Sequence, residues 1–139
     1  MSSCLVNPRA CFETELRVEP ADVTKTVAIV GAGPAGLSAA LTAAERGHQV
    51  TLFDKADEIG GQLNMAKQVP GKEEFFGLVD YYRNEVGRLG IELRLNTFVA
   101  ADDLDGFDEV VIATGVTPRD PQIDGQDGPN VVSYIDVLR

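Results

Sequence analysis

Apolar and polar residues follow two different periods along the first half of the chain, and these predict a strand, a helix and a second strand. Residues 26–30 and 49–53 are short runs rich in β-prone apolar side chains, which is typical of buried parallel strands. Between them, apolar side chains recur at the spacing of one helix face, at Leu37, Ala40, Leu41 and Ala44. Gly47 follows where a left-handed glycine commonly ends a helix.

A second long helix is predicted between the Pro70–Gly71 turn and Gly90, over roughly residues 72–89. Its apolar stripe consists of Phe75, Val79, Tyr82, Val86 and Leu89. Apolar and charged residues then alternate over 91–95, which predicts a half-buried strand. Phe98 and Val99 either continue this strand or start the next one.

The remaining elements are one further strand over 108–113 and the start of a helix, or a connector, over 133–139. This order of elements predicts an α/β fold, namely a Rossmann-like, doubly wound parallel sheet with its ligand at the carboxyl ends of the strands. We expect residues 1–24 to form an extended arm. Residues 25–139 are then a partial FAD/NAD(P)-binding domain.

The junction between the first strand and its helix carries the motif G-x-G-x-x-G within TVAIVGAGPAG, residues 26–36. Gly31 permits a tight turn, Gly33 lets the backbone approach a pyrophosphate, and Gly36 allows close packing of the helix on the strand. The helix N-terminus then offers unpaired N–H groups and the positive end of its dipole to the phosphates. The motif alone is a weak signal, but its position between a strand and a helix makes it a strong one.

An acidic residue, Asp54, ends the second strand at roughly 20 residues beyond the last glycine. A carboxylate in that place can accept hydrogen bonds from both ribose hydroxyls of an adenosine and repels a 2′-phosphate. The β–α–β unit is therefore predicted to hold FAD or NAD(H) rather than NADPH. The alternative interpretation of Asp54 is a surface aspartate that only ends a strand.

Composition limits the classes of partner. The chain has 139 residues, of which 44% are hydrophobic, so it corresponds to one domain or a piece of one. A net charge of −10 argues against nucleic acid or anionic membrane as a partner. There is no apolar run of the roughly 18 residues that a membrane span needs, and the cytoplasm is the expected compartment.

The chemistry-bearing residues outside the motif are few. Cys4 and Cys11 could form a disulfide, remain free thiols or bind a metal with ligands from elsewhere, and composition favours free thiols. His48, the only histidine, lies between a helix end and a strand, where a structural role is favoured over catalysis.

Four segments together resemble the NADPH-dependent 2,4-dienoyl-CoA reductases, which are related to trimethylamine dehydrogenase and 2-enoate reductase. They are SCLVNPRAC (3–11), VTLFDKADEIGGQLNMAKQVPGKEEF (50–75), VVIATGVTPRDPQIDG (110–125) and VVSYIDVLR (131–139). The G-G-Q-x-N run and the K-Q-x-P-G-K-E-E-F run are narrow signals. GAGPAG and ATG are shared by many flavoproteins with two nucleotide-binding domains.

The resemblance implies a larger enzyme, in which an FMN-carrying barrel and a [4Fe–4S] cluster segment precede the FAD domain. An NADPH domain is inserted within that FAD domain. Electrons pass from NADPH through FAD and the cluster to FMN, and then to the dienoyl thioester. We expect this chain to be the FAD-binding middle piece, ending before the NADPH domain and inactive alone.

The resemblance also implies roles for individual residues. Gly31, Gly33, Pro34, Ala35 and Gly36 match the pyrophosphate turn, and Asp54 matches the ribose ligand. Gln62 matches a side chain that lies along FAD, and Val99 matches a residue whose backbone meets the adenine edge. Thr114 and Gly115 match a turn that runs close to the cofactor. Lys72 matches a basic residue beside the dinucleotide, although a surface lysine at a helix start is the alternative.

Cys4 matches the fourth cysteine of the cluster motif, whereas Cys11 matches no ligand. A [4Fe–4S] cluster needs four thiolates, and the other three ligands are not in this sequence. The chain therefore departs from the family pattern and is not expected to assemble a cluster by itself.

Two other functions remain open. The chain could be the ADP-binding domain of an amine dehydrogenase or an enoate reductase relative, or a non-catalytic nucleotide-binding module. In each case a truncated sheet is expected to leave an edge strand and apolar surface uncovered, which favours dimer formation.

Overall fold

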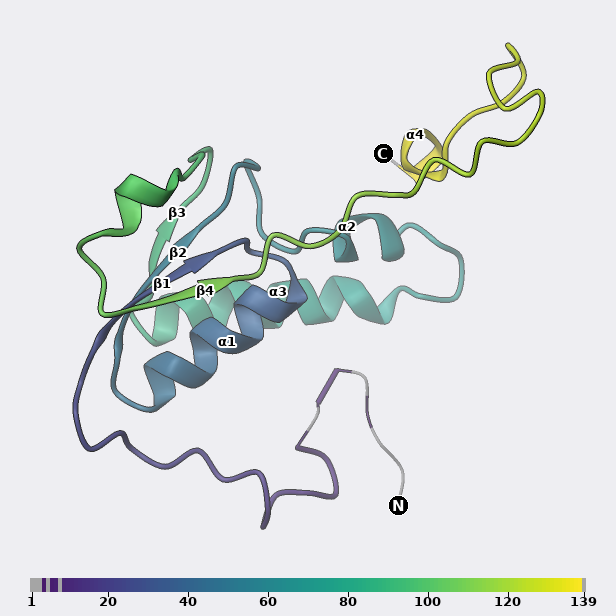
Figure 1. Cartoon of the computed structure of the whole chain (residues 1–139). Coiled ribbons are helices and arrows are strands. Elements are labelled where there is room, and N and C mark those ends of the chain that lie inside the picture. The colour runs from purple at the N-terminus through teal and green to yellow at the C-terminus, as the bar shows by residue number, and fades with distance from the viewer. Residues whose placement is uncertain (1–3, 5, 8, 139) are drawn as a thin grey trace.

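The computed structural model describes residues 4, 6–7 and 9–138. In this part of the chain, four parallel strands form one sheet in the order β3–β2–β1–β4 (Figure 1). The strands are β1 (Thr26–Val30), β2 (Gln49–Phe53), β3 (Glu92–Arg94) and β4 (Glu109–Ile112), and the helices are α1 (Pro34–Glu45), α2 (Leu63–Ala66), α3 (Glu74–Arg88) and α4 (Tyr134–Leu138). This strand order is that of half of a doubly wound sheet, so the predicted fold class is confirmed.

One face of the sheet is covered by α1 and α3, which share a core with it. Val27, Ile29, Val50 and Leu52 alternate along β1 and β2 toward this core, where they meet Leu37 and Leu41 of α1 and Val79 and Val86 of α3. The apolar stripes predicted for both helices are therefore the buried ones. The α1 helix ends at Glu45, and Gly47 has a φ of +92°, in the left-handed region that glycine adopts without strain.

The opposite face of the two central strands is closed by the segment that leads into β4. Thr51 and Phe53 of β2 are buried there, and the Phe107 ring packs edge-on against Phe53 at 6.0 Å between ring centroids. Both faces of β1 and β2 are thus covered, which agrees with their apolar composition.

The third strand is shorter than predicted, and the placement of Phe98 and Val99 in a strand is wrong. Asn96 has a φ of +52°, which takes the backbone out of the extended conformation directly after β3. The N–H groups of Asn96 and Thr97 instead donate to the carbonyl oxygens of Ala56 and Asp54, at 2.8 and 2.9 Å. This segment therefore continues as a loop that lies beside the end of β2.

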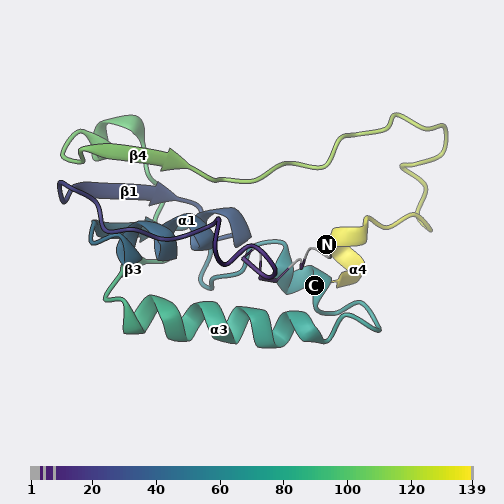
Figure 2. The ribbon, with the colours of Figure 1, turned by 90° about the horizontal axis from the view of Figure 1, so that it is seen from below.

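The fourth strand is an edge strand, and its apolar side chains Val110, Val111 and Ile112 are exposed. After β4 the chain runs away from the sheet in an extended segment and then turns back to α4, which lies near α2 (Figure 2). None of the helices in the described ranges is both long and apolar enough to cross a membrane.

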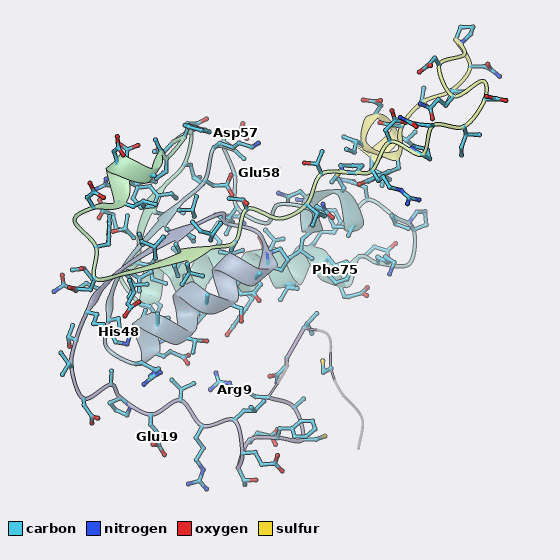
Figure 3. All side chains as sticks on the ribbon, viewed as in Figure 1. Arg9, Glu19, His48, Asp57, Glu58 and Phe75 are labelled. Carbon is cyan, nitrogen blue, oxygen red and sulfur yellow. The ribbon has the colours of Figure 1, made fainter. Side chains whose placement is uncertain are left out.

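The link before β1 is held by the histidine. The backbone N–H of Lys25 donates to Nδ1 of His48 at 3.1 Å, and this ring lies beside the end of α1 (Figure 3). This contact supports the structural role predicted for His48.

The carboxylate of Asp108, just before β4, links this strand to the start of β1 by hydrogen bonds. Asp108 accepts hydrogen bonds from the N–H and the Oγ of Thr26, at 2.7 and 2.8 Å. These two hydrogen bonds, with the backbone one dominant, hold the pKa of Asp108 below its ordinary value of 3.8. The folded protein therefore favours the charged carboxylate at this position.

We expect Asp108→Asn to reduce the dependence of stability on acid pH. Because the folded pKa lies below the unfolded one, the carboxylate stabilises the fold fully above the unfolded pKa and loses this effect as the pH falls through the folded pKa. Urea unfolding of the unaltered chain and of Asp108→Asn should be measured from about pH 6 down to about pH 3. The difference between their free energies of unfolding should become smaller as the pH falls. A gap that stays constant over this range would contradict the assignment.

Candidate functional site

The glycine turn lies at the carboxyl end of β1, and two of its glycines are required by the packing of the chain itself. Gly31 has a φ of +112°, and a Cβ atom there would lie 2.3 Å from the carbonyl oxygen of Ala113. A Cβ on Gly36 would lie 1.8 Å from the carbonyl oxygen of Gly31. These glycines bring α1 and the end of β4 against the turn, as the motif predicts.

The middle glycine is different, because nothing in the chain requires it. Gly33 has an extended backbone, with φ −77° and ψ −178°, and no atom lies within 4 Å of the place where a Cβ would stand. A Cβ atom at this position would therefore fit both the backbone and the packing. In the glycine motif, a phosphate occupies the space beside the middle glycine. Because this space is open at Gly33, the turn can accept the diphosphate of a dinucleotide.

The first turn of α1 supplies donors to that space. Ala35 and Gly36 lie in this turn, where amides have no acceptor within the helix, and Pro34 has no N–H to leave unpaired. Within the described residues, no side chain caps this helix and its first turn contains no acidic residue. The helix end therefore presents N–H groups and a positive dipole to an anion.

Asp54 lies at the carboxyl end of β2, beside this turn. Its Oδ2 accepts the N–H of Ala32 at 2.6 Å, and its Oδ1 accepts the N–H of Ala56 at 2.8 Å. The half-buried carboxylate thus ties the glycine turn to the loop after β2. A carboxylate has about four acceptor positions, so about two remain for hydroxyl groups of a ligand.

This bridging role of Asp54 is not visible in the sequence. The spacing after the glycines indicates a ribose ligand, but the N–H of Ala32 comes close only because β1 and β2 pair in register, with Val30 beside Phe53. Asp54 therefore lies where the sequence predicts, and it also holds the glycine turn through Ala32, which the sequence does not predict.

Two further loops border the turn. A Cβ on Gly61 would lie 3.0 Å from the Cα of Gly33, and the N–H of Gly60 donates to the carbonyl oxygen of Ala32 at 2.8 Å. The side-chain Nε2 of Gln62 lies 3.5 Å from the carbonyl oxygen of Val116, which follows the turn after β4. The G-G-Q loop thus lies between the glycine turn and the chain that follows β4.

The turn after β4 lies against Gly31, since a Cβ there would also come within 3.0 Å of the backbone nitrogen of Thr114. Thr114 is exposed, and Gly115 has a φ of +79°. The structure therefore brings Thr114, Gly115 and Gln62 to the edge of the sheet that carries the glycine turn.

The adenine-edge residue predicted from the resemblance follows β3. Val99 is half-buried and comes two residues after Thr97, whose N–H donates to the Asp54 carbonyl oxygen. Val99 therefore follows a segment that is hydrogen-bonded to the end of β2.

Lys72 is not brought to the glycine turn by any contact found among the described residues. Its ammonium lies 5.7 Å from the centre of the Phe75 ring, and its side chain stands just before α3. This position agrees with the alternative of a surface lysine at a helix start.

Cys4 and Cys11 are exposed free thiols, as composition favoured. Over the described ranges, no group of three or more metal-ligating side chains is found. The role of Cys4 as a cluster ligand stays a prediction.

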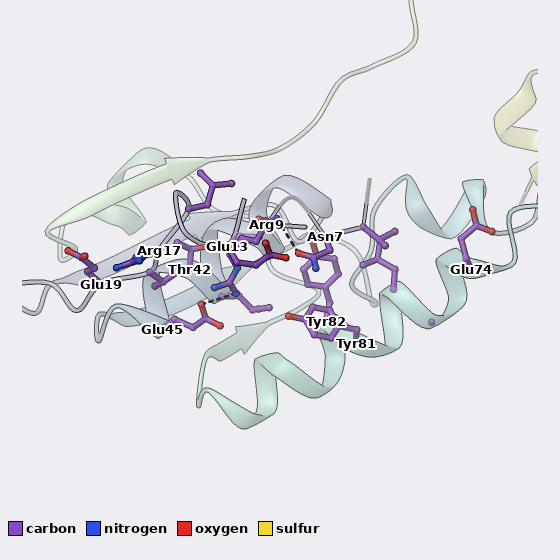
Figure 4. Close-up of a pocket in the computed structure, with 17 residues that line it drawn as sticks. Asn7, Arg9, Glu13, Arg17, Glu19, Thr42, Glu45, Glu74, Tyr81 and Tyr82 are labelled. Atoms are coloured by element: carbon purple, nitrogen blue, oxygen red, sulfur yellow. Dashed lines mark hydrogen bonds and ion pairs between the residues drawn. The ribbon is translucent and has the colours of Figure 1, made fainter. Parts of the chain in front are cut away.

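A cleft of about 1140 Å³ lies elsewhere, between the N-terminal arm and the outer surface of α1 and α3 (Figure 4). Arg9 of the arm pairs with Glu45 of α1 at 3.5 Å, and Tyr81 and Tyr82 of α3 line the cleft opposite them. Its lining includes no residue of the glycine turn and not Asp54. The sequence did not predict this cleft, because it depends on how a non-periodic arm folds back on two helices.

Comparison with known proteins gives the family. The profile of the pyridine nucleotide-disulphide oxidoreductases matches residues 25–139. Among curated relatives, a metal reductase of Desulforamulus reducens is 39% identical over 98% of this chain and 21% of its own length. The chain therefore spans about a fifth of the length of such relatives.

Solved structures agree with this placement. A 2-naphthoyl-CoA reductase in complex with 2-naphthoyl-CoA is 39% identical, with a TM-score of 0.90 over 98% of this chain and 21% of its own. A 6-hydroxypseudooxynicotine amine oxidase of Pseudomonas geniculata N1 is 32% identical, with a TM-score of 0.81 over 98% of this chain and 23% of its own.

Proposed function

Because the chain belongs to the pyridine nucleotide-disulphide oxidoreductase family, we propose that it is the FAD-binding part of a larger oxidoreductase of the NADPH-dependent 2,4-dienoyl-CoA reductase type. The observation that carries the dinucleotide-binding part of this proposal is the open position at Gly33, which neither backbone nor packing requires to be glycine. It lies between the N-terminus of α1 and the carboxylate of Asp54, which are a phosphate site and a hydroxyl acceptor.

In this proposal the residues of the turn hold the diphosphate. The amides of Ala35 and Gly36 donate to its oxygens, while Gly33 leaves the space that they occupy. Asp54 accepts the ribose hydroxyls, and the backbone at Val99 meets the adenine edge. Gln62, Thr114 and Gly115 border the path toward the flavin ring. Lys72 is proposed to contribute positive charge beside the dinucleotide.

FAD, when bound, supplies two-electron acceptance from NADPH and onward transfer of those electrons. We propose that a separate NADPH domain of the longer protein provides the donor, and that a [4Fe–4S] cluster with Cys4 as one ligand and a barrel-bound FMN lie downstream. The chain itself positions the cofactor and contributes no acid or base to the chemistry.

The substrate class rests on relatives. The 2-naphthoyl-CoA reductase acts on a coenzyme A thioester, which favours an acyl-CoA substrate for the longer protein. The amine oxidase keeps the second candidate open, an amine dehydrogenase or enoate reductase relative whose equivalent domain holds ADP. A nucleotide-binding module without redox chemistry is the third.

The test is retention of flavin. We expect the purified chain, incubated with FAD and desalted, to keep flavin absorbance near one equivalent per chain. No retained flavin, together with ADP binding in a titration of the same sample, would favour the ADP-binding alternative. Failure to bind either ligand would overturn the proposal. For the longer protein, NADPH oxidation with a dienoyl-CoA or an enoate as the electron acceptor would support a reductase. Reduction of an artificial electron acceptor by an amine, without NADPH, would instead support the amine dehydrogenase.

A further inference from the structure

Phe98 is the most exposed large hydrophobic side chain in the described part of the chain, with 81% of its surface accessible. It does not lie on a loose segment. On one side of it, the N–H groups of Asn96 and Thr97 bond to the loop after β2, and on the other side the N–H of Ala100 donates to Asp103 at 2.8 Å. The fold therefore holds a phenylalanine in solvent at the carboxyl end of the sheet.

The strand order indicates which part of a bound nucleotide would lie nearest to the segment that carries Phe98. The diphosphate site follows β1, and the hydroxyl acceptor Asp54 follows β2. A nucleotide laid along these two sites has its base on the side of the ribose away from the phosphates, and the next strand in that direction is β3. Neighbouring strands lie about 4.8 Å apart, so the base of such a nucleotide would lie near the segment that follows β3.

We propose that Phe98 is a positioning residue for the nucleotide, its ring stacking on the purine face of the adenine. This inference rests on the proposed function, because it needs a nucleotide in the site. An aromatic ring stacks on any base, but a purine offers it more surface than a pyrimidine does. Phe98 thus favours an adenine nucleotide over a pyrimidine nucleotide with the same sugar and diphosphate.

The test is a titration of the full chain with ADP and UDP. Phe98→Ala is expected to weaken ADP binding roughly fivefold to hundredfold, with a smaller effect on UDP, so the ratio of the two affinities falls. Phe98→Tyr keeps an aromatic ring and should leave the ratio of ADP to UDP affinity as in the unaltered chain. Phe76→Ala is the matched control, since Phe76 is also exposed, at 45%, but lies on α3 with its ring under the ammonium of Lys67.

A fluorescence measurement makes the contact direct. The chain has no tryptophan, so Phe98→Trp introduces a single reporter. Saturable quenching of its emission by ADP is expected, whereas Phe76→Trp should stay unquenched.

The outcomes separate the two proposals. If the unaltered chain binds no ADP, the nucleotide site itself is misplaced. If it binds ADP and Phe98→Ala binds ADP equally well, the site stands and the stacking role is overturned. Equal losses for ADP and UDP would also overturn it, because they would indicate a general disturbance of the loop.

Discussion

Replacing Gly33 with valine is expected to abolish FAD binding while the chain stays folded. The position has an extended backbone, and apart from its chain neighbours no atom lies within 4 Å of an added Cβ, so the Cβ of a valine is accommodated. It would instead fill the space that the diphosphate needs. The free energy of unfolding, measured with urea, should fall by about 2 kcal/mol or less, the range of a helix N-cap substitution, while flavin retention disappears.

The matched variant is Gly36→Ala, at the other end of the same turn. Its Cβ would lie 1.8 Å from the carbonyl oxygen of Gly31, so α1 and β1 must separate. We expect a loss of about 3 kcal/mol or more in unfolding free energy, and binding lost as a consequence of unfolding. If Gly33→Val lost stability like Gly36→Ala, or kept FAD, the assignment of Gly33 to ligand approach would be wrong.

Replacing Asp54 with alanine is expected to weaken ADP or FAD binding by roughly tenfold to hundredfold. Hydrogen bonds to a charged group contribute about 1.5–3 kcal/mol, and here they are those to the ribose hydroxyls. The variant also leaves the N–H groups of Ala32 and Ala56 without their acceptor, so a moderate loss of stability accompanies it. Isothermal titration and urea unfolding measure the two effects separately.

Two controls make the result specific. Asp57 is an exposed carboxylate on the same loop, so Asp57→Ala should bind ADP with unchanged affinity. The unaltered chain should also prefer ADP to 2′-deoxy-ADP, and Asp54→Ala should lose this preference. A variant that still distinguished the two nucleotides would show that another group reads the ribose.

The sequence predicted the β1–α1–β2 unit well because its signals are local. A strand, three glycines, an amphipathic helix and an acidic strand end occupy one short stretch, and each needs only neighbours in the sequence to be interpreted. The limits of α3 and β4 were predicted to within two residues for the same reason.

Other features depend on tertiary contacts and could not be predicted in this way. The left-handed Asn96 breaks the strand pattern before Phe98, although the apolar residues there suggest that it continues. The short helix α2 carries no periodic signal within its few residues. The N–H of Ala32, which donates to Asp54, comes from a segment that meets Asp54 only when the sheet has formed.

One spectrum tests the central claim, that a nucleotide lies across the carboxyl ends of β1, β2 and β3. In a titration of the ¹⁵N-labelled chain with ADP, we expect the amide resonances of Gly33, Ala35, Gly36 and Val99 to shift together and saturate. Those of Leu16 and Tyr81, in the cleft beside the N-terminal arm, should stay in place. Shifts confined to the cleft, with the glycine turn unmoved, would contradict the account.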